Sequence, residues 1–148
     1  MSGDNERPIK MTIYSTPAHL PVVRAAVDKA CHQAGFDDET AGAVVLSVDE
    51  ALTNIIKHAY GGAGDQQIDV ELRYVGSPAE ALQIRLRDYG PRVDPQQIKS
   101  RDLADVRPGG LGVHIISECM DGVEFEPGAD CGTVLTMIKR LPAGKEAN

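Results

Sequence analysis

Two neighbouring segments of the chain, residues 68–75 (IDVELRYV) and 81–87 (ALQIRLR), alternate apolar and polar side chains with a period of two. This alternation is typical of β-strands that bury one face. The Gly76-Ser-Pro break between the segments predicts a turn, so the two strands are expected to pair antiparallel. Such a sheet needs other elements to cover its apolar face.

The rest of the chain supplies those elements in a definite order. Periodicity predicts strands at 10–15, 123–126 and 133–139 and helices at 20–34, 38–59 and 111–120. Asp38 can cap the second helix, Thr40 is a competing cap, and Tyr60-Gly-Gly ends it. The order predicts the fold class α+β: a two-layer α/β sandwich whose mostly antiparallel, mixed sheet is covered on one face by helices.

The size and charge of the chain exclude several classes of protein. Its 148 residues are typical of one domain, expected over 1–148 with a folded core at 8–141 between short polar tails. Asp and Glu (22) outnumber Lys and Arg (15), which argues against direct nucleic-acid binding and against docking on an anionic membrane. No apolar run reaches the ~18 residues of a membrane span and the polar start lacks a signal-peptide core, so we expect a cytoplasmic protein. The three cysteines show no C-x-x-C spacing, which argues against a zinc site.

A file of three polar residues marks the second predicted helix. Glu50, Asn54 and His58 recur at intervals of four residues, so in an α-helix they lie along one face, opposite an apolar face. On these residues alone, the solvated side of an amphipathic helix is the simpler interpretation. Other motifs along the chain decide whether the file carries chemistry.

Two glycine-containing motifs favour a ligand site. Asp88 ends an apolar strand and is followed by Tyr89-Gly90-Pro91, which places its carboxylate where a loop lets a ligand approach. A carboxylate there can accept a hydrogen bond from an exocyclic amine such as that of adenine. Further on, Gly109-Gly110-Leu111-Gly112 precedes a helix, an arrangement that offers bare backbone N–H groups to phosphate. The polar stretch 91–108 is either a loop over a ligand or a surface segment.

These motifs form an ordered set: E-x-x-x-N on a helix, D-x-G after a strand, G-G-L-G before a helix and Gly132-Thr133 at the last strand. Neither a Walker-type P-loop nor a G-x-G-x-x-G after the first strand is present. In this order the motifs resemble the Bergerat-fold ATP-binding superfamily of gyrase, ninety-kilodalton heat-shock chaperones, histidine kinases and mismatch-repair ATPases. Within it, the His58-Ala59-Tyr60 ending and the short lid resemble the anti-sigma-factor serine/threonine kinase group. The resemblance covers almost the whole chain and is carried by SVDEALTNIIKHAYGG, RLRDYGPRVDP, GGLGVHIISECMDGVEFE and GTVLTMIKRL.

The resemblance implies binding of ATP and Mg²⁺ and gives roles to individual residues. Glu50 is similar to the family's catalytic base, which takes a proton from the attacking hydroxyl, and Asn54 is similar to its Mg²⁺ ligand. Asp88 resembles the adenine-reading carboxylate, with Gly90 letting the base approach. Thr133 resembles the residue that supports this carboxylate or its water.

The lid completes the nucleotide site that the resemblance implies. Gly110 and Gly112 correspond to the glycines that fold the lid across the phosphates. The other nucleotide-binding residues expected there are His58, Gly109 and Leu111. Arg92 replaces the second glycine of D-x-G-x-G and could offer its charge to a phosphate. Pro108 replaces the first glycine of the lid motif and stiffens the hinge.

The implied function is that of a serine/threonine protein kinase that phosphorylates an anti-sigma-factor antagonist and sequesters a sigma factor, with a homodimer left open. The alternative is a non-catalytic, nucleotide-dependent interaction switch of the same fold, in which ATP orders the lid at 91–108. The presence of Glu50 favours the kinase. The output half of a histidine kinase is not expected, because the sequence shows no upstream dimerisation segment with a phospho-accepting histidine.

Overall fold

The predicted hairpin is present in the computed structural model, which describes residues 7–76, 78–91 and 111–142. Strands β2 (Gln67–Val75) and β3 (Ala81–Asp88) pair antiparallel, with Ile68 opposite Asp88 and Val75 opposite Ala81. The other elements are β1 (Ile9–Tyr14), the 3₁₀ turn η1 (Pro17–His19), α2 (Leu20–Gln33), α3 (Asp38–Asn54), the π-helical turn η2 (Ile55–Ala59), α5 (Leu111–Cys119), β4 (Gly122–Pro127) and β5 (Thr133–Arg140). The predicted strands and the helices at 20–34 and 111–120 are confirmed, with bounds within one residue of those expected. The helix predicted over 38–59 is confirmed as α-helix only to Asn54, and its last five residues form the π-helical turn η2.

The sheet has five strands in the order β1-β2-β3-β5-β4. Strand β4 runs in the same direction as β3, but β5 returns between them and pairs antiparallel with both. The pairings of β1 with β2 and of β2 with β3 are antiparallel as well. The α+β class is therefore confirmed, while the sheet formed by the described strands is wholly antiparallel rather than mixed.

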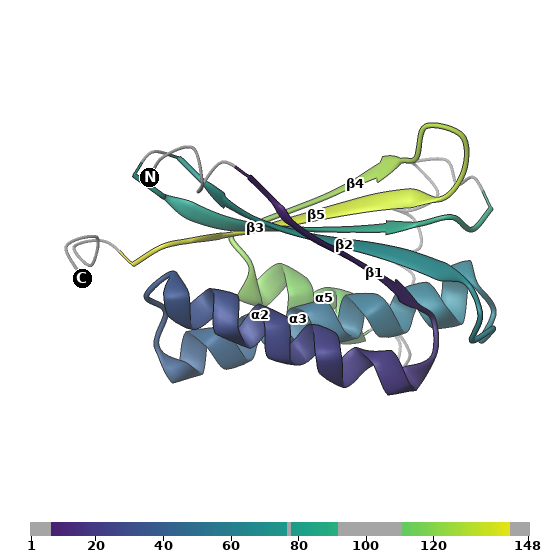
Figure 1. Cartoon of the computed structure of the whole chain (residues 1–148), viewed down its shortest axis with the longest axis horizontal. Coiled ribbons are helices and arrows are strands. Elements are labelled where there is room, and N and C mark those ends of the chain that lie inside the picture. The colour runs from purple at the N-terminus through teal and green to yellow at the C-terminus, as the bar shows by residue number, and fades with distance from the viewer. Residues whose placement is uncertain (1–6, 77, 92–110, 143–148) are drawn as a thin grey trace.

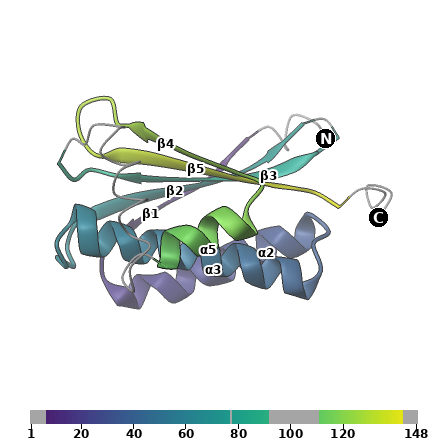
Figure 2. The same ribbon diagram turned by 180° about the vertical axis from the view of Figure 1, so that it is seen from behind.

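Helices α2, α3 and α5 all lie against one face of this sheet, as in a two-layer sandwich (Figure 1). Helix α3 contacts both α2 and α5, and α5 is seen in front of α3 from behind (Figure 2). Within the described ranges, no helix combines the length and apolar character required to cross a bilayer. These helices leave the opposite face of the sheet uncovered, and Arg87 of β3 lies on that face.

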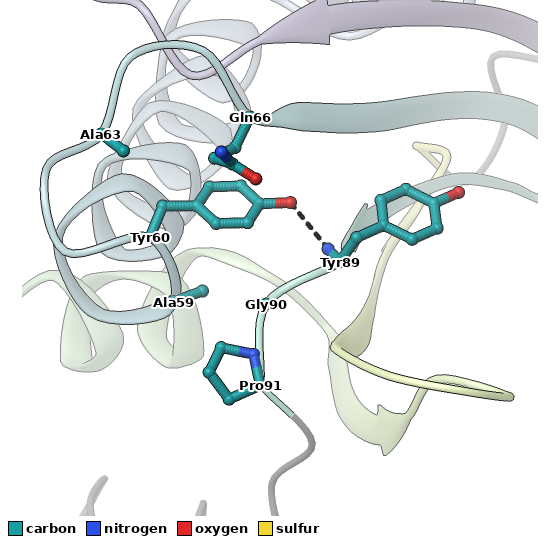
Figure 3. Close-up of a pocket in the computed structure, with 7 residues that line it drawn as sticks. All are labelled: Ala59, Tyr60, Ala63, Gln66, Tyr89, Gly90 and Pro91. Atoms are coloured by element: carbon teal, nitrogen blue, oxygen red, sulfur yellow. Dashed lines mark hydrogen bonds between the residues drawn. The ribbon is translucent and has the colours of Figure 1, made fainter.

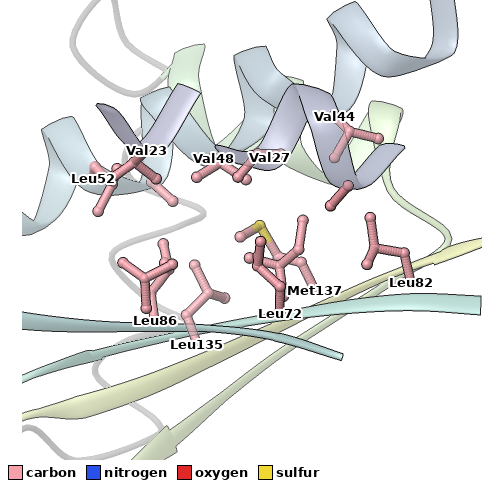
Figure 4. Packing of buried hydrophobic residues seen from close by; sticks show 14 of the residues in the cluster. Val23, Val27, Val44, Val48, Leu52, Leu72, Leu82, Leu86, Leu135 and Met137 are labelled. Carbon is pink, nitrogen blue, oxygen red and sulfur yellow. The ribbon is translucent and has the colours of Figure 1, made fainter. Parts of the chain in front are cut away.

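The core fills the space between the helices and the sheet (Figure 4). Its almost fully buried members include Val23 and Val27 of α2, Val44, Val48 and Leu52 of α3, and Leu82, Leu86 and Met137 of the sheet. Burial of one such side chain contributes about 1.5–3 kcal/mol. This packing holds α3, the helix with the predicted polar file, firmly on the sheet.

The start of α3 differs from the sequence prediction. Asp37, with an extended backbone (φ −74°, ψ 172°), is the N-cap, and its Oδ1 accepts a hydrogen bond from the Thr40 N–H at 2.8 Å. Asp38 and Thr40 already lie inside the helix, where the extended backbone of a cap is not available, so both predicted caps are wrong. Asp38 instead accepts a hydrogen bond from His32 Nε2 at 2.8 Å, which joins the end of α2 to the start of α3.

The contact between His32 and Asp38 predicts a pH-dependent stability. Hydrogen bonds to the Asp38 carboxylate and the Asp28 carbonyl raise the pKa of His32 above its ordinary value of 6.5. The protonated pair therefore stabilises the fold fully below the unfolded-state pKa, and this contribution is lost as the pH rises through the higher folded-state pKa. Thermal unfolding from about pH 5 to about pH 8.5 should show the advantage of the wild type over His32→Gln shrinking above about pH 6.5. An advantage that does not change with pH would contradict this prediction.

Candidate functional site

The candidate site begins at the end of α3, where the helix changes its geometry. Glu50 and Asn54 lie in the α-helical part, one turn apart and partly exposed. The π-helical turn η2 follows at once and is closed by the Tyr60 N–H, which donates to the Ile55 carbonyl over 3.1 Å. His58 is exposed and lies in this π-helical turn, not in the α-helical part that holds Glu50 and Asn54. The structure therefore places Glu50 and Asn54 one α-helical turn apart and His58 in the π-helical turn that follows.

Asp88 is the last residue of β3 and is buried, with only 5% of its surface exposed. Its Oδ1 accepts hydrogen bonds from the Gly90 N–H at 3.0 Å and the Thr133 N–H at 3.3 Å. Burial raises the pKa of Asp88, while these two amides and the Arg87 charge act in the opposite direction. No group of the described residues hydrogen-bonds to Oδ2. One carboxylate oxygen is therefore anchored by two backbone N–H groups, while the other has no hydrogen-bond partner among the described residues.

Two glycines let the chain close around Asp88. A Cβ at Gly90 would lie 2.8 Å from the Ala59 carbonyl oxygen, so the turn after β3 lies directly against η2. Gly132 has a positive φ of 69°, and a Cβ there would lie 2.1 Å from the Asp88 carbonyl oxygen. The role that the resemblance gives Gly90, letting the adenine base approach, stays a prediction, whereas the structure shows that the missing side chain lets η2 approach.

Gly132→Ala is expected to destabilise the protein more than Gly62→Ala. Both glycines have positive φ, 69° and 87°, so alanine at either position incurs left-handed backbone strain of roughly 1–2 kcal/mol. Gly132 also has a backbone atom in the way of a Cβ, whereas nothing lies within 4 Å of a Cβ at Gly62. We expect the Gly132 variant to lose about 1–3 kcal/mol more in urea unfolding, the typical cost of overpacking. Equal losses would contradict the close approach of Gly132 to Asp88.

Arg87 fastens the end of β3 from the uncovered face of the sheet. Its Nη2 donates to the Cys131 carbonyl at 2.9 Å and its Nε to the Asp88 carbonyl at 3.1 Å. The guanidinium carbon lies 4.6 Å from the centre of the Tyr89 ring, within cation–π range. Arg87 therefore holds the chain just before Thr133 next to Asp88. Arg87 is a site residue without a motif of its own: in the sequence it is marked only by its place beside Asp88 on the polar side of the strand.

An open pocket of about 410 Å³ lies between the turn after β3 and the loop after η2 (Figure 3). Its described lining residues are Ala59, Tyr60, Ala63, Gln66, Tyr89, Gly90 and Pro91. Asp88, Glu50 and Asn54 are not among them, and Gly90 is the lining residue that also contacts the Asp88 carboxylate. The buried carboxylate, rather than this volume, therefore marks the candidate site.

The remaining predicted site residues lie at or beyond the edge of the described ranges. Leu111 and Gly112 belong to the first turn of α5, so the last two residues of the glycine motif lie inside the helix rather than before it. Arg92, Gly109 and Gly110 lie outside the described residues, as does the predicted lid apart from Pro91.

The donor groups present fit a nucleotide with a magnesium ion. Mg²⁺ prefers oxygen ligands and is usually held by one or two protein groups together with substrate phosphates. Glu50 and Asn54 offer such oxygens, and neither side chain hydrogen-bonds to another described residue. Over the same described ranges, no cluster of three or more His, Cys, Asp or Glu side chains could hold a metal ion without other ligands. Oδ2 of Asp88 fits the adenine amine, because an ionised carboxylate only accepts hydrogen bonds.

The described strands form an antiparallel sheet with helices on one face, and a buried acid at the end of β3 lies against two glycines. The profile of the histidine kinase-like ATPase domain matches residues 13–139, and the chain belongs to this family. The resemblance predicted from the four motifs is thereby confirmed.

Individual similar proteins agree with this assignment. The serine-protein kinase RsbW of Halalkalibacterium halodurans is 28% identical over 136 residues, which cover 90% of this chain and 83% of that protein. Among solved structures, the RsbU and RsbW domains of Rv1364c from Mycobacterium tuberculosis have a TM-score of 0.61 at 18% identity, covering 91% of this chain and 32% of that one. A chain of the SiaB-SiaC complex from Pseudomonas aeruginosa has a TM-score of 0.60 at 14% identity, and the match covers 94% of this chain and 94% of that one. At these identities the two structures show a shared fold.

Proposed function

We propose that this protein is an ATP-dependent serine/threonine protein kinase that phosphorylates an anti-sigma-factor antagonist and sequesters a sigma factor. One spatial relation supports the proposal most. Glu50 and Asn54 lie one turn apart on α3, and the turn η2 that follows them contacts Gly90, whose N–H holds Asp88. An acid, an oxygen ligand for a metal and an adenine-reading carboxylate are groups that phosphoryl transfer from ATP uses. The similarity to a protein named as a serine-protein kinase also supports it.

Each of these residues has a definite role in the proposal. Oδ2 of Asp88 accepts a hydrogen bond from the adenine amine, while the amides of Gly90 and Thr133 hold Oδ1. Asn54 is the ligand for Mg²⁺, which when bound supplies positive charge against the phosphates. Glu50 accepts the proton of the serine or threonine hydroxyl as that hydroxyl oxygen attacks the γ-phosphorus of ATP, while the bond from this phosphorus to the bridging oxygen breaks and ADP leaves.

The phosphate side of the site and the partners are proposed on sequence and similarity. The residues proposed for the phosphates are His58, Arg92, Gly109, Gly110, Leu111 and Gly112. The likeness to a chain of the SiaB-SiaC complex supports a protein partner. The protein is proposed to act in the cytoplasm, without direct contact with nucleic acid or membrane.

Incubation of the purified protein with γ-labelled ATP, Mg²⁺ and the antagonist encoded near it tests the proposal. We expect label on a serine or threonine of the antagonist. Failure to bind ATP in a calorimetric titration would refute the nucleotide site itself. ATP binding without transfer, combined with ATP-dependent binding of the antagonist, would favour the non-catalytic interaction switch.

A further inference from the structure

The side-chain oxygen of Tyr60 joins the two halves of the proposed ATP site. The phenol donates a hydrogen bond to the Gln67 carbonyl over 2.5 Å and accepts one from the Tyr89 N–H over 2.6 Å. The backbone N–H of Tyr60 closes η2, the turn that follows Asn54 directly. Figure 3 shows the ring reaching from the end of η2 toward the turn that contains Gly90. Tyr60 thus connects the end of the helix to the adenine side of the site.

The turn after β3 is held on its other sides by separate contacts. The Tyr89 phenol donates to the Asp69 carboxylate on the uncovered face of the sheet, where Arg87 also lies over its ring. Gly90 lies against Ala59 and donates its N–H to Oδ1 of Asp88. Among the described residues, Tyr60 is the group that holds the Tyr89 N–H. A shift of this N–H would move Gly90, and with it the anchored carboxylate.

The phenol of Tyr60 is suited to this double role. Burial raises the pKa of Tyr60, with the Tyr89 amide acting in the opposite direction, so the hydroxyl keeps its proton near neutral pH. A protonated hydroxyl donates one hydrogen bond and can accept another, as it does here between two backbone groups. Phenylalanine at this position would leave both backbone groups without that partner.

We infer that Tyr60 is a positioning residue for the nucleotide: its hydroxyl sets the place of the Asp88–Gly90 turn against η2 and thereby tightens the binding of ATP. The inference rests on the proposed function, because it concerns the same site. Tyr60 acts through Tyr89 and Gly90 rather than on the reacting atoms. Its loss should therefore raise the Kd of ATP more than it lowers the rate of transfer at Glu50.

Tyr60→Phe tests the inference, with Tyr74→Phe as a matched control. The Tyr74 hydroxyl also donates to a backbone carbonyl, that of Ala30 at 3.0 Å, with Gln33 Oε1 as a competing acceptor at 3.3 Å. Along β2, Tyr74 lies roughly 23 Å from Gln67, at about 3.3 Å per residue. We expect the calorimetric Kd of Mg²⁺-ATP to rise about five- to twentyfold in Tyr60→Phe, as for a lost hydrogen bond. The Tyr74 variant should stay within about twofold of wild type, and kcat at saturating ATP within about threefold in both variants.

Two results would overturn the inference and leave the proposed function intact: equal ATP affinity in wild type and Tyr60→Phe, or an equal loss in both phenylalanine variants. A wild type that binds no ATP would instead refute the proposed function and the inference with it.

Hydrogen exchange of the wild type provides a second measurement that needs no variant. The Tyr89 amide should be protected without nucleotide, although the residue is 40% exposed, because Tyr60 accepts its hydrogen bond. Free exchange at this amide would overturn the inference.

Discussion

Asp88→Asn is expected to weaken ATP binding roughly 10- to 100-fold while leaving the fold at least as stable as wild type. The single oxygen of the new amide can still accept from the Gly90 and Thr133 N–H groups that now hold Oδ1. The NH₂ group then takes the place of Oδ2 and faces the adenine amine, so two donors meet in a buried position. Leaving a buried donor unpaired costs about 1–3 kcal/mol, which corresponds to this loss of affinity.

The stability of the same variant follows from the pKa of Asp88. Burial raises this pKa above the unfolded value, so the protonated form is favoured in the folded state and its contribution to stability is lost as the pH rises through the folded pKa. At neutral pH the ionised carboxylate opposes folding, and the neutral amide removes that cost. Thermal unfolding should show Asp88→Asn gaining on the wild type as the pH rises from about 4 to about 7, the range above the ordinary carboxyl pKa.

Asp121→Asn provides the control for the change in net charge. Its carboxylate also accepts a backbone hydrogen bond, from the Arg140 N–H at 2.7 Å, but at the far end of β5 from Thr133. Calorimetric titration should give this variant the ATP affinity of wild type. Equal ATP affinity in Asp88→Asn and wild type would remove Asp88 from the nucleotide site. An affinity loss accompanied by a matching loss of stability would mean that the amide disturbs the fold.

Most of the fold could be predicted because it depends on local periodicity. Strands β2 and β3 alternate regularly, and their bounds agree with the sequence prediction to one residue. The cap of α3 could not be predicted in this way, because Asp37, Asp38 and Thr40 are all good capping types and the choice depends on the backbone angles of one residue. The position of β5 between β3 and β4 depends on pairing between strands that are distant in the sequence. The sequence therefore did not reveal that all described strand pairs are antiparallel.

The same distinction between local patterns and long-range contacts applies to the residues of the candidate site. Glu50, Asn54 and Asp88 stand in motifs with regular spacing, and the sequence prediction selected them. Arg87 contacts the carbonyl of a residue 44 positions away, and Tyr60 contacts the amide of a residue 29 positions away. Their partners are backbone groups, which every residue type carries, so no pattern of side chains predicts such contacts. The π-helical turn after Asn54 could not be predicted for a related reason: the five residues IIKHA carry no side-chain pattern that distinguishes a π-helical turn from an α-helical one.

Glu50→Ala and Asn54→Ala are expected to separate catalysis from binding. Removing a general base typically lowers a rate 10²- to 10⁴-fold, so Glu50→Ala should lower phosphate transfer by at least about 100-fold. Its Kd for Mg²⁺-ATP should stay within about threefold of wild type, because a proton acceptor acts mainly in the transition state. Asn54→Ala removes a group that holds the ground-state complex, so it should raise the Kd at least about tenfold and lose transfer as well.

Asp49→Ala is the matched control for both variants, since it removes a neighbouring carboxylate from the same helix. Asp49 pairs with Nε of Arg24 at 2.7 Å, and an exposed ion pair of this kind contributes at most about 1 kcal/mol. Alanine is the best helix former, so none of the three changes should unfold α3. Calorimetry and the labelled-ATP assay on all four proteins then distinguish the roles, with Asp49→Ala transferring phosphate at the wild-type rate. If Glu50→Ala does the same, Glu50 is not the base, and the nucleotide-dependent interaction switch becomes the better account of this site, because ATP would still bind at Asp88 without any chemistry at the helix.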